Sequence, residues 1–197
     1  MKRIILYRFG LLVAFLITTV TFAFSQAQHN HEANLSVSKD NRATSTKTTA
    51  ESARAAFEKF TKLNGEWMGR STKGWEEKVS FRAIAQGSVV VENSFDAHPN
   101  ETMMTMFYLD QGRLMLTHYC VAKNQPRLVA SSFDEDGKTI SFTFLDATNL
   151  PSRDNGHMDK AVFKFIDENT ITTQWTWYQN GKENWMEEIK LQRIKGK

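Results

Sequence analysis

Four ionisable side chains alternate with apolar residues along the chain: Glu77, His157, Asp159 and Glu187. In an extended strand every second side chain points to the same face, so these four are expected to face inward with their apolar neighbours. A buried charge without a partner is costly, and such groups pair, line a cavity or change protonation. Two interpretations stay open: structural pairs near strand ends, or polar groups that orient a ligand in an apolar pocket.

The densest chemistry lies in the run Thr-His-Tyr-Cys that ends at Cys120, followed by Asn-Gln-Pro-Arg ending at Arg127. Both faces of this segment are apolar, so either His118 and Cys120 point inward or Tyr119 does. Neighbours on a strand face opposite ways, and adjacency therefore creates no catalytic dyad. Arg127 either reaches an acidic ligand or an inward glutamate, or forms a structural salt bridge.

Aromatic side chains share the faces of these ionisable groups. Burial of apolar ligand surface against the rings, with polar groups setting specificity, is the predicted binding mechanism. The candidate site combines Trp75, Phe142, Phe144, Phe163, Trp175, Trp177 and Trp185 with the polar residues His118, Tyr119, Arg127, His157, Glu77 and Glu187. The same rings could instead fill the interior, which would give a packed structural or interaction domain without a ligand.

Established catalytic motifs are absent from the sequence. It holds no Gly-x-Ser-x-Gly elbow, Walker loop, dinucleotide fingerprint or His-Glu-x-x-His, and no Cys/His set has zinc spacing. No metal and no cofactor are predicted. The enzyme alternative uses His118 or His157 as general base, oriented by Glu77 or Glu187, within hydrogen-bond reach inside an open cavity.

The elements that must position these residues are strands. From Gly65 onward the hydrophobic period is two, with turn signals such as Gln86-Gly87 and Asn180-Gly181 between apolar runs. Short connections imply an up-and-down meander, and closure into a ten-stranded antiparallel β-barrel removes its exposed edges. The longest connector, residues 147–156, either flanks a barrel mouth or is only a connection. The predicted strands are 65–71, 75–84, 88–95, 102–109, 113–121, 127–133, 139–146, 157–166, 170–178 and 183–193.

A short amphipathic helix is predicted just before the first strand. Thr48 and Glu51 have capping-box spacing, and Gly65 ends the helical pattern. The apolar face should pack on the β domain, across one open end of the barrel. That face consists of Ala53, Ala56, Phe57 and Phe60.

The N-terminal residues predict export. Residues 1–27 combine a basic start, an apolar run and small residues before a cleavage site, which is typical of a signal peptide and leaves no stable membrane anchor after cleavage. Residues 28–47 have the composition of a flexible leader, so the barrel domain covers 48–197. The chain has 25 Lys plus Arg and 22 Asp plus Glu, and three of the basic residues lie in the signal. The rest of the chain therefore has no basic excess, which argues against nucleic-acid binding. The expected location is periplasmic or extracellular, and Cys120, the only cysteine, is expected to be buried.

The run Gly65-Glu66-Trp67, just after the predicted helix, resembles the Gly-x-Trp motif of the calycin superfamily, which includes lipocalins, fatty-acid-binding proteins and nitrobindin-like haem barrels. The resemblance implies that Trp67 plugs one barrel end. Ten strands fit the fatty-acid-binding and nitrobindin-like members better than eight-stranded lipocalins. The chain lacks the fuller Gly-rich first-strand signature of nitrobindin-like proteins, so haem is only an alternative, with His118 and His157 as ligands by residue type.

Stretches near the predicted site also resemble a group of uncharacterised bacterial exported proteins of lipocalin-like type. The matching stretches are 116–120, 124–127, 156–158 and 175–177. The likeness implies a fold and no established activity. The function predicted from the residues is an exported barrel that holds a small apolar or amphipathic molecule.

Overall fold

A computed structural model describes residues 49–95, 100–134 and 136–195 of the chain. The predicted signal peptide, the predicted leader and the capping residue Thr48 lie outside the described residues. Within the described ranges, no helix combines the length and apolar character needed to cross a membrane.

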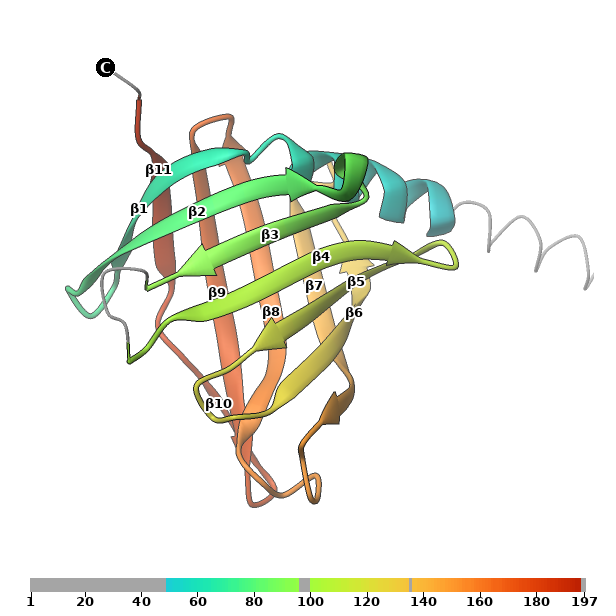
Figure 1. The fold of residues 1–197 in the computed structure, drawn as a ribbon, viewed down its shortest axis with the longest axis vertical. Coiled ribbons are helices and arrows are strands. Elements are labelled where there is room, and N and C mark those ends of the chain that lie inside the picture. Colours follow the sequence, from blue (N-terminus) through green and yellow to red (C-terminus); the bar gives the residue numbers. More distant parts are fainter. Residues whose placement is uncertain (1–48, 96–99, 135, 196–197) are drawn as a thin grey trace, which may run out of the picture. The chain divides into compact units, whose positions relative to one another are not determined.

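The described residues form one antiparallel sheet that closes on itself (Figure 1). The segments are β1 (Gly65–Ser71), β2 (Glu76–Ile84), β3 (Val89–Ser94), β4 (Met103–Asp110), β5 (Arg113–Tyr119), β6 (Gln125–Phe133), β7 (Thr139–Thr148), β8 (His157–Asp167), β9 (Thr170–Gln179), β10 (Lys182–Trp185) and β11 (Ile189–Arg193), with a short 3₁₀ turn, η1 (Ala85–Gly87), between β2 and β3. Each strand from β1 to β10 pairs with the next, as expected of an up-and-down meander.

The barrel is closed by the last predicted strand, which confirms the ten-stranded prediction. That strand forms two segments, because β10 and β11 both pair with β9 and residues 186–188 between them are irregular, with the Met186 amide still donating to the Trp175 carbonyl oxygen of β9 at 2.8 Å. β11 also pairs with β1, and β8 pairs with β9, so the hydrogen-bonded ring is continuous. Two predicted boundaries fell two residues short: β6 starts at Gln125 and β7 runs to Thr148, and these two residues face each other in the pairing.

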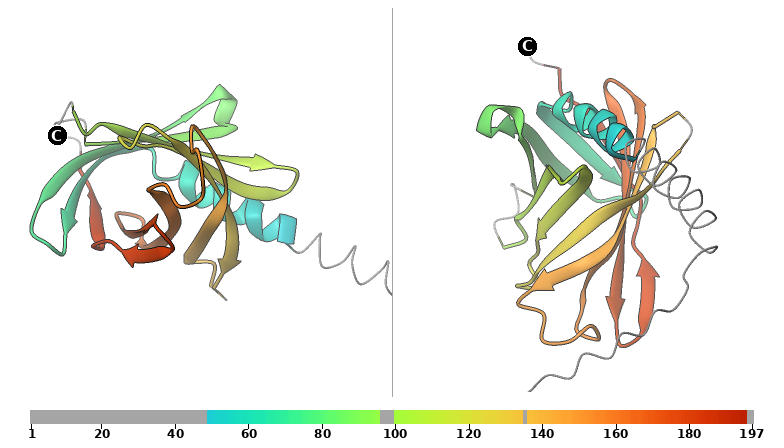
Figure 2. Two further views of the ribbon diagram at one scale, coloured as in Figure 1. Left: turned by 90° about the horizontal axis from the view of Figure 1, so that it is seen from below. Right: turned by 90° about the vertical axis from the view of Figure 1, so that its right-hand side faces the viewer.

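The helix of residues 49–61 packs across one end of the barrel (Figures 1 and 2). Phe60 is completely buried, and its ring stacks on Phe107 of β4 with centroids 4.2 Å apart. It also meets Phe163 and Phe165 of β8 edge-on, at 5.3 Å each. The predicted apolar face of the helix is buried in the same core as the inward side chains of the strands.

Trp67 of β1 lies in this helix-capped end and is fully buried. Its Nε1 donates to the carbonyl oxygen of Leu63 at 2.8 Å, which satisfies the indole and fixes the chain between helix and strand. The Arg193 guanidinium lies 4.3 Å from the Trp67 ring centroid and donates to carbonyl oxygens of Lys62 and Asn64. The interior is therefore packed at this end, and a binding site inside the barrel must lie further along the strands.

Candidate functional site

A cavity of about 90 Å³ occupies the interior beyond this packed core. Its wall combines aromatic rings, thioethers and a small set of ionisable groups. Some wall residues are partly exposed, and these form a rim where the cavity opens to the protein surface. The lining residues are Trp75, Glu77, Glu92, Ser94, Phe95, Met103, Thr105, His118, Met158, Thr173, Trp175, Met186, Glu187 and Ile189.

A polar row crosses three neighbouring strands at the inner end of the cavity. The strand register pairs Glu92 of β3 with Thr105 of β4, and Thr105 with His118 of β5. Thr105 Oγ1 lies 3.0 Å from His118 Nδ1, and the Thr105 hydroxyl also hydrogen-bonds the Glu92 carboxyl. The next row toward the helix holds Val90 and Phe107 at the corresponding positions, so the polar row directly borders the apolar core.

Three buried atoms in this cavity have no hydrogen-bond partner within the described part of the chain: Glu77 Oε2, Glu92 Oε2 and His118 Nε2. The three residues are only 5 %, 7 % and 4 % exposed. Buried polar atoms are normally satisfied, and orphaned ones mark functional sites or bound solvent and ligands. Three of them in one cavity make this the candidate site.

Burial governs the protonation of these groups. It raises the pKa of Glu77 to about 7, against a lowering contribution from a hydrogen bond donated by the Phe95 amide. It raises the pKa of Glu92 to about 8, reinforced by the nearby charge of Glu77. It lowers the pKa of His118 to about 4, so the imidazole is neutral. Near neutral pH Glu77 and Glu92 are thus uncharged or partly charged, and the imidazole of His118 is neutral.

The position of Glu77 depends on a glycine in the neighbouring strand. Gly69 of β1 pairs with Glu77 of β2, and a Cβ at Gly69 would lie 2.7 Å from Glu77 Cγ and 2.8 Å from Leu191 Cδ2. Only a residue without a side chain leaves room for the carboxyl arm there. Phe95, whose amide bonds this carboxyl, has φ +59°, a conformation that side chains disfavour.

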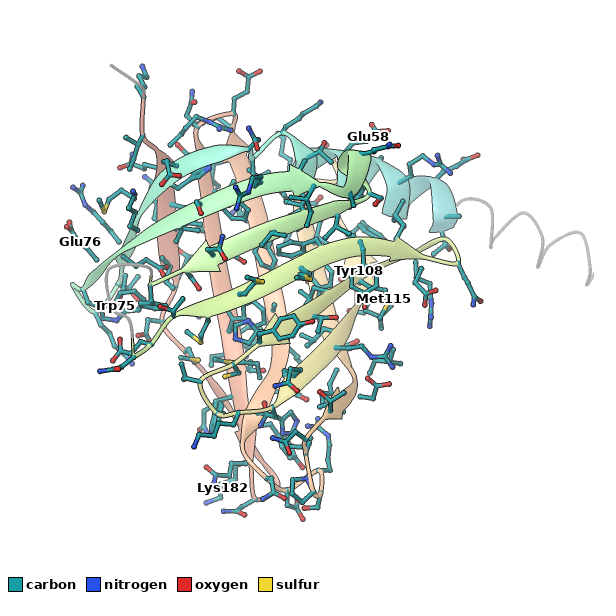
Figure 3. All side chains as sticks on the ribbon, in the orientation of Figure 1. Glu58, Trp75, Glu76, Tyr108, Met115 and Lys182 are labelled. Atoms are coloured by element: carbon teal, nitrogen blue, oxygen red, sulfur yellow. The ribbon has the colours of Figure 1, made fainter. Side chains whose placement is uncertain are left out.

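The rim of the cavity is held by a third carboxylate. Glu187 accepts a hydrogen bond from Trp75 Nε1 at 2.8 Å and from Lys73 Nζ at 3.0 Å. Burial alone would raise the pKa of Glu187. The pKa is nevertheless below its usual value, because the carboxylate accepts these two hydrogen bonds and a third from its own backbone amide, and because the Lys73 charge is close. The Trp75 ring lies 5.5 Å from Phe95. Figure 3 shows Trp75 at the β1–β2 hairpin, beside the exposed Glu76.

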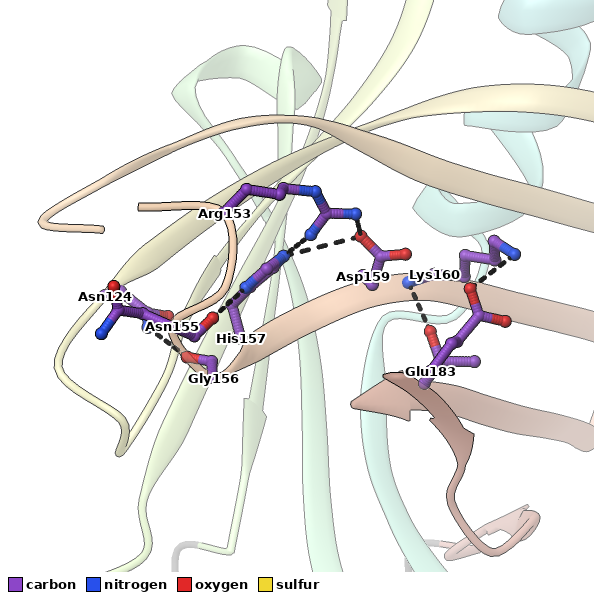
Figure 4. Close-up of polar contacts among 9 residues, drawn as sticks. Asn124, Arg153, Asn155, Gly156, His157, Asp159, Lys160 and Glu183 are labelled. Carbon is purple, nitrogen blue, oxygen red and sulfur yellow. Dashed lines mark hydrogen bonds and ion pairs between the residues drawn. The ribbon is translucent and has the colours of Figure 1, made fainter. Parts of the chain in front are cut away.

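A second polar cluster lies at the barrel end opposite the helix, where residues 149–156 fold back on the strands (Figure 4). Arg153 donates to Asp159 and to His157 Nε2, and its guanidinium lies 4.3 Å from the Phe144 ring and 4.1 Å from the Tyr178 ring. An arginine only donates, and the Asn155 carbonyl 2.6 Å from His157 Nδ1 only accepts, so His157 carries its proton on Nδ1. Both ring nitrogens are therefore engaged in fixing the loop.

The structure separates the predicted site residues into distinct groups. Trp75, Glu77, His118, Trp175 and Glu187 line the cavity. Phe142 and Phe163 belong to the packed core, and Phe144 and His157 belong to the loop cluster. On β5 the inward choice is His118 rather than Tyr119, which is 43 % exposed.

The remaining predicted residues lie away from the cavity wall. Arg127 forms an exposed ion pair with Asp146, the structural salt bridge left open by the sequence. Trp185 is 51 % exposed on β10. The Trp177 ring packs where Gly156 has no side chain, since a Cβ there would lie 2.2 Å from the ring.

Sequence reasoning missed Glu92, Thr105 and the thioethers of the wall. Glu92 stands in the run Val-Val-Val-Glu-Asn-Ser, where Val residues on both faces conceal the inward set. The alternation of Val90, Glu92 and Ser94 was the available signal. Met103, Met158 and Met186 carry no recognisable spacing because they come from three distant parts of the chain. No cluster of three or more His, Cys, Asp or Glu suited to a metal occurs in the described ranges.

Comparison with known proteins identifies no family for this chain. No protein-family model matches the chain, and no curated protein matches its sequence. Among solved structures, the chain is similar to a protein of unknown function of the DUF3598 family from Nostoc punctiforme, at 10 % identity and a TM-score of 0.43. The match covers 68 % of this chain and 49 % of that one, so it spans about half the length of that structure.

Proposed function

We propose that this protein is an exported, calycin-like barrel that binds one small molecule in the cavity bordered by Glu77, Glu92 and His118. The observation that carries the proposal is the group of three orphaned polar atoms on residues that line one cavity. Apolar walls with a few converging polar groups are the usual form of a ligand site. The buried plug Trp67 supports the calycin likeness, and residues 1–27 support export to the periplasm or beyond.

The size of the cavity limits the ligand. About 90 Å³ is below the roughly 300–1,000 Å³ of sites for drug-sized ligands, and nearer the roughly 150 Å³ that accommodates benzene. A ligand of a few heavy atoms fits. A haem macrocycle would need a far larger opening, and we do not propose it.

An enzyme is the second candidate, and the chain from Glu92 through Thr105 to His118 is the observation that favours it. A carboxyl with a raised pKa beside an imidazole with a lowered one is the pattern of an acid and a base with separate roles. His118 and Glu92 meet only through Thr105, and an imidazole with a pKa of about 4 is a weak base. Ligand binding is therefore the function that we favour over catalysis.

Native mass spectrometry of the mature protein, purified from an exporting host, tests the proposed function. We expect a stoichiometric adduct of low mass that is lost on denaturation. In protein with ¹³C-labelled Met methyl groups, removing the adduct should shift the NMR signals of Met103, Met158 and Met186. Met104 and Met106, which alternate with the inward residues of β4, serve as internal controls.

The proposal would be contradicted by an adduct-free mass together with unresponsive cavity methyl signals across small cationic, neutral and anionic compounds. A chemically altered compound released during incubation would favour the enzyme candidate instead. These outcomes separate the two functions even while the identity of the ligand is unknown.

A further inference from the structure

The ionisable groups of the cavity wall are mostly acidic. The wall carries three carboxyl groups, on Glu77 of β2, Glu92 of β3 and Glu187 between β10 and β11, and one imidazole, on His118 of β5. Among the residues that the structure describes, no lysine or arginine lines the cavity; the nearby Lys73 is bonded to Glu187. A carboxylate or phosphate would find no cationic partner here, whereas a cation would find Glu77 and Glu92 without one.

The hydrogen-bond chemistry of the polar row is fixed when Glu92 is ionised. A carboxylate only accepts, so Thr105 must donate its hydroxyl proton to Glu92. The Thr105 oxygen then only accepts from the imidazole, and His118 Nδ1 must be the donor. His118 Nε2 consequently keeps a free lone pair, as do Glu77 Oε2 and Glu92 Oε2. All three acceptors belong to residues that line the same small cavity.

A primary ammonium group matches this set in its number of hydrogen-bond donors and is opposite to it in the sign of its charge. It has three N–H donors and one positive charge. The apolar part of such a ligand would lie against the thioethers and the Trp175 ring, whose centroid is 4.9 Å from that of His118. Indole faces attract cations, which adds to the preference.

We propose that the ligand of this cavity is a small primary amine, bound as its ammonium ion by the carboxylates of Glu77 and Glu92 and by His118 Nε2. This inference rests on the proposed binding function and specifies its chemistry. The ligand enters as a cation, because an alkylamine has a pKa near that of lysine, about 10.4. Its binding displaces protons from the two carboxyls, which hold them in the empty cavity.

The test compares three probes of equal length: butylammonium, 1-butanol and butyrate. Each is titrated into the mature protein by calorimetry, with the methyl signals of Met103, Met158 and Met186 reporting the site. We expect butylammonium to bind, butyrate not to bind, and 1-butanol to bind at least about tenfold more weakly. Butylammonium affinity should rise about tenfold or more from about pH 6 to about pH 8.5, with proton release, because both carboxyls must ionise.

Isosteric variants locate the effect. Glu77→Gln and Glu92→Gln should each weaken butylammonium binding about tenfold or more and reduce its pH dependence. Glu76→Gln is the matched control, since Glu76 neighbours Glu77 on the opposite, exposed face and pairs with Arg70. It removes the same charge and should leave the affinity unchanged.

Three kinds of result would overturn the amine proposal. The first is evidence that the carboxyls act protonated, as donors to a neutral ligand: an affinity for 1-butanol equal to that for butylammonium, or a butylammonium affinity that falls with rising pH. Another is capture of Cu⁺ in preference to butylammonium and insensitive to both Gln substitutions, because thioethers and imidazole would then be the ligands. The third is that none of the three probes shifts the cavity methyl signals. A native adduct of other chemistry would in that case still support the binding function.

Discussion

Glu77 and Glu92 are costly residues in the folded barrel, since burial disfavours their charged forms and the two charges repel each other. In the folded protein their pKa values are about 7 and about 8, against 4.5 in the unfolded chain. The folded state therefore binds more protons than the unfolded state between about pH 4.5 and 8. Its stability contribution from these groups is greatest below pH 4.5 and is lost as the pH rises through this range.

The double variant Glu77→Gln/Glu92→Gln should therefore be more stable than the wild type, by a margin that grows from about pH 5 to about pH 8.5. Thermal unfolding of both proteins across this range measures the margin. His118, whose lowered pKa gives the opposite trend between 6.5 and about 4, is present in both and largely cancels. A margin that stays constant or shrinks with pH would show that the carboxyls are charged in the folded state or well solvated.

Gly69 gives a second test at the scale of one residue. In Gly69→Ala the added methyl meets Glu77 Cγ and Leu191 Cδ2, and relieving such overpacking costs about 1–3 kcal/mol. Urea denaturation should show this loss. The loss should be smaller in a Glu77→Ala background, where half of the conflict is gone. Equal losses in both backgrounds would mean that Glu77 does not lie against β1.

Single residues of the site were only partly predictable. Glu77 could be found because Glu77, Val79 and Phe81 alternate with exposed residues along one strand. Glu92 was missed, since the three valines before it lie on both faces of the strand, and its role depends on cross-strand pairing with Thr105. Trp185 has the correct alternation but stands on β10, which pairs with β9 alone and leaves the indole exposed.

At the scale of elements, the loop of residues 149–156 is fixed by one arginine. Asp159, the partner of Arg153, has a side chain only 6 % exposed, whereas the exposed Arg127–Asp146 pair on the outer wall leaves 44 % and 48 % of its side chains in solvent. Removing one partner of a buried pair leaves an uncompensated charge, but the same change at the surface costs little.

Arg153→Ala should therefore destabilise the protein by about 2–3 kcal/mol, a value below the full buried-pair cost because the Arg153 side chain is itself 42 % exposed. Arg127→Ala, the matched control, should cost less than about 1 kcal/mol. Urea denaturation midpoints of the two variants measure the difference. Similar losses in both would indicate that the Arg153 cluster is solvated and does not hold the loop.

The observed element boundaries agree closely with those predicted from the sequence wherever the turn residues were clear. The turn at Asn180-Gly181 separates β9 from β10 as expected from its hairpin chemistry. The interruption between β10 and β11 was not predicted, although the sequence carried a signal: Met186 and Glu187 break the alternation of apolar and polar residues there. That interruption places Glu187 at the cavity rim, where the Trp75 indole and Lys73 bind it.

At the scale of the whole molecule, the barrel is filled at one end and hollow beyond it. The meander and its closure could be predicted from alternation and short turns. The division of the interior could not, because the aromatic residues look alike in sequence: Phe142 and Phe163 pack with the helix, whereas Trp175 lines the cavity. Register across ten strands decides which rings meet, and register is set by the complete fold.

The helix should consequently be an integral part of one cooperative unit. Phe60 lies at the centre of the core, against Phe107, Phe163 and Phe165, so Phe60→Ala should cost about 3–5 kcal/mol. The control Phe133→Ala removes a ring that is only partly buried at the edge of the same core, and should cost about half as much or less. Chemical denaturation followed by tryptophan fluorescence and by far-ultraviolet circular dichroism should give coincident transitions for both variants. If Phe60→Ala instead cost no more than Phe133→Ala, or split the transition in two, the helix would be a separate attachment and the barrel end would be closed by strand residues alone.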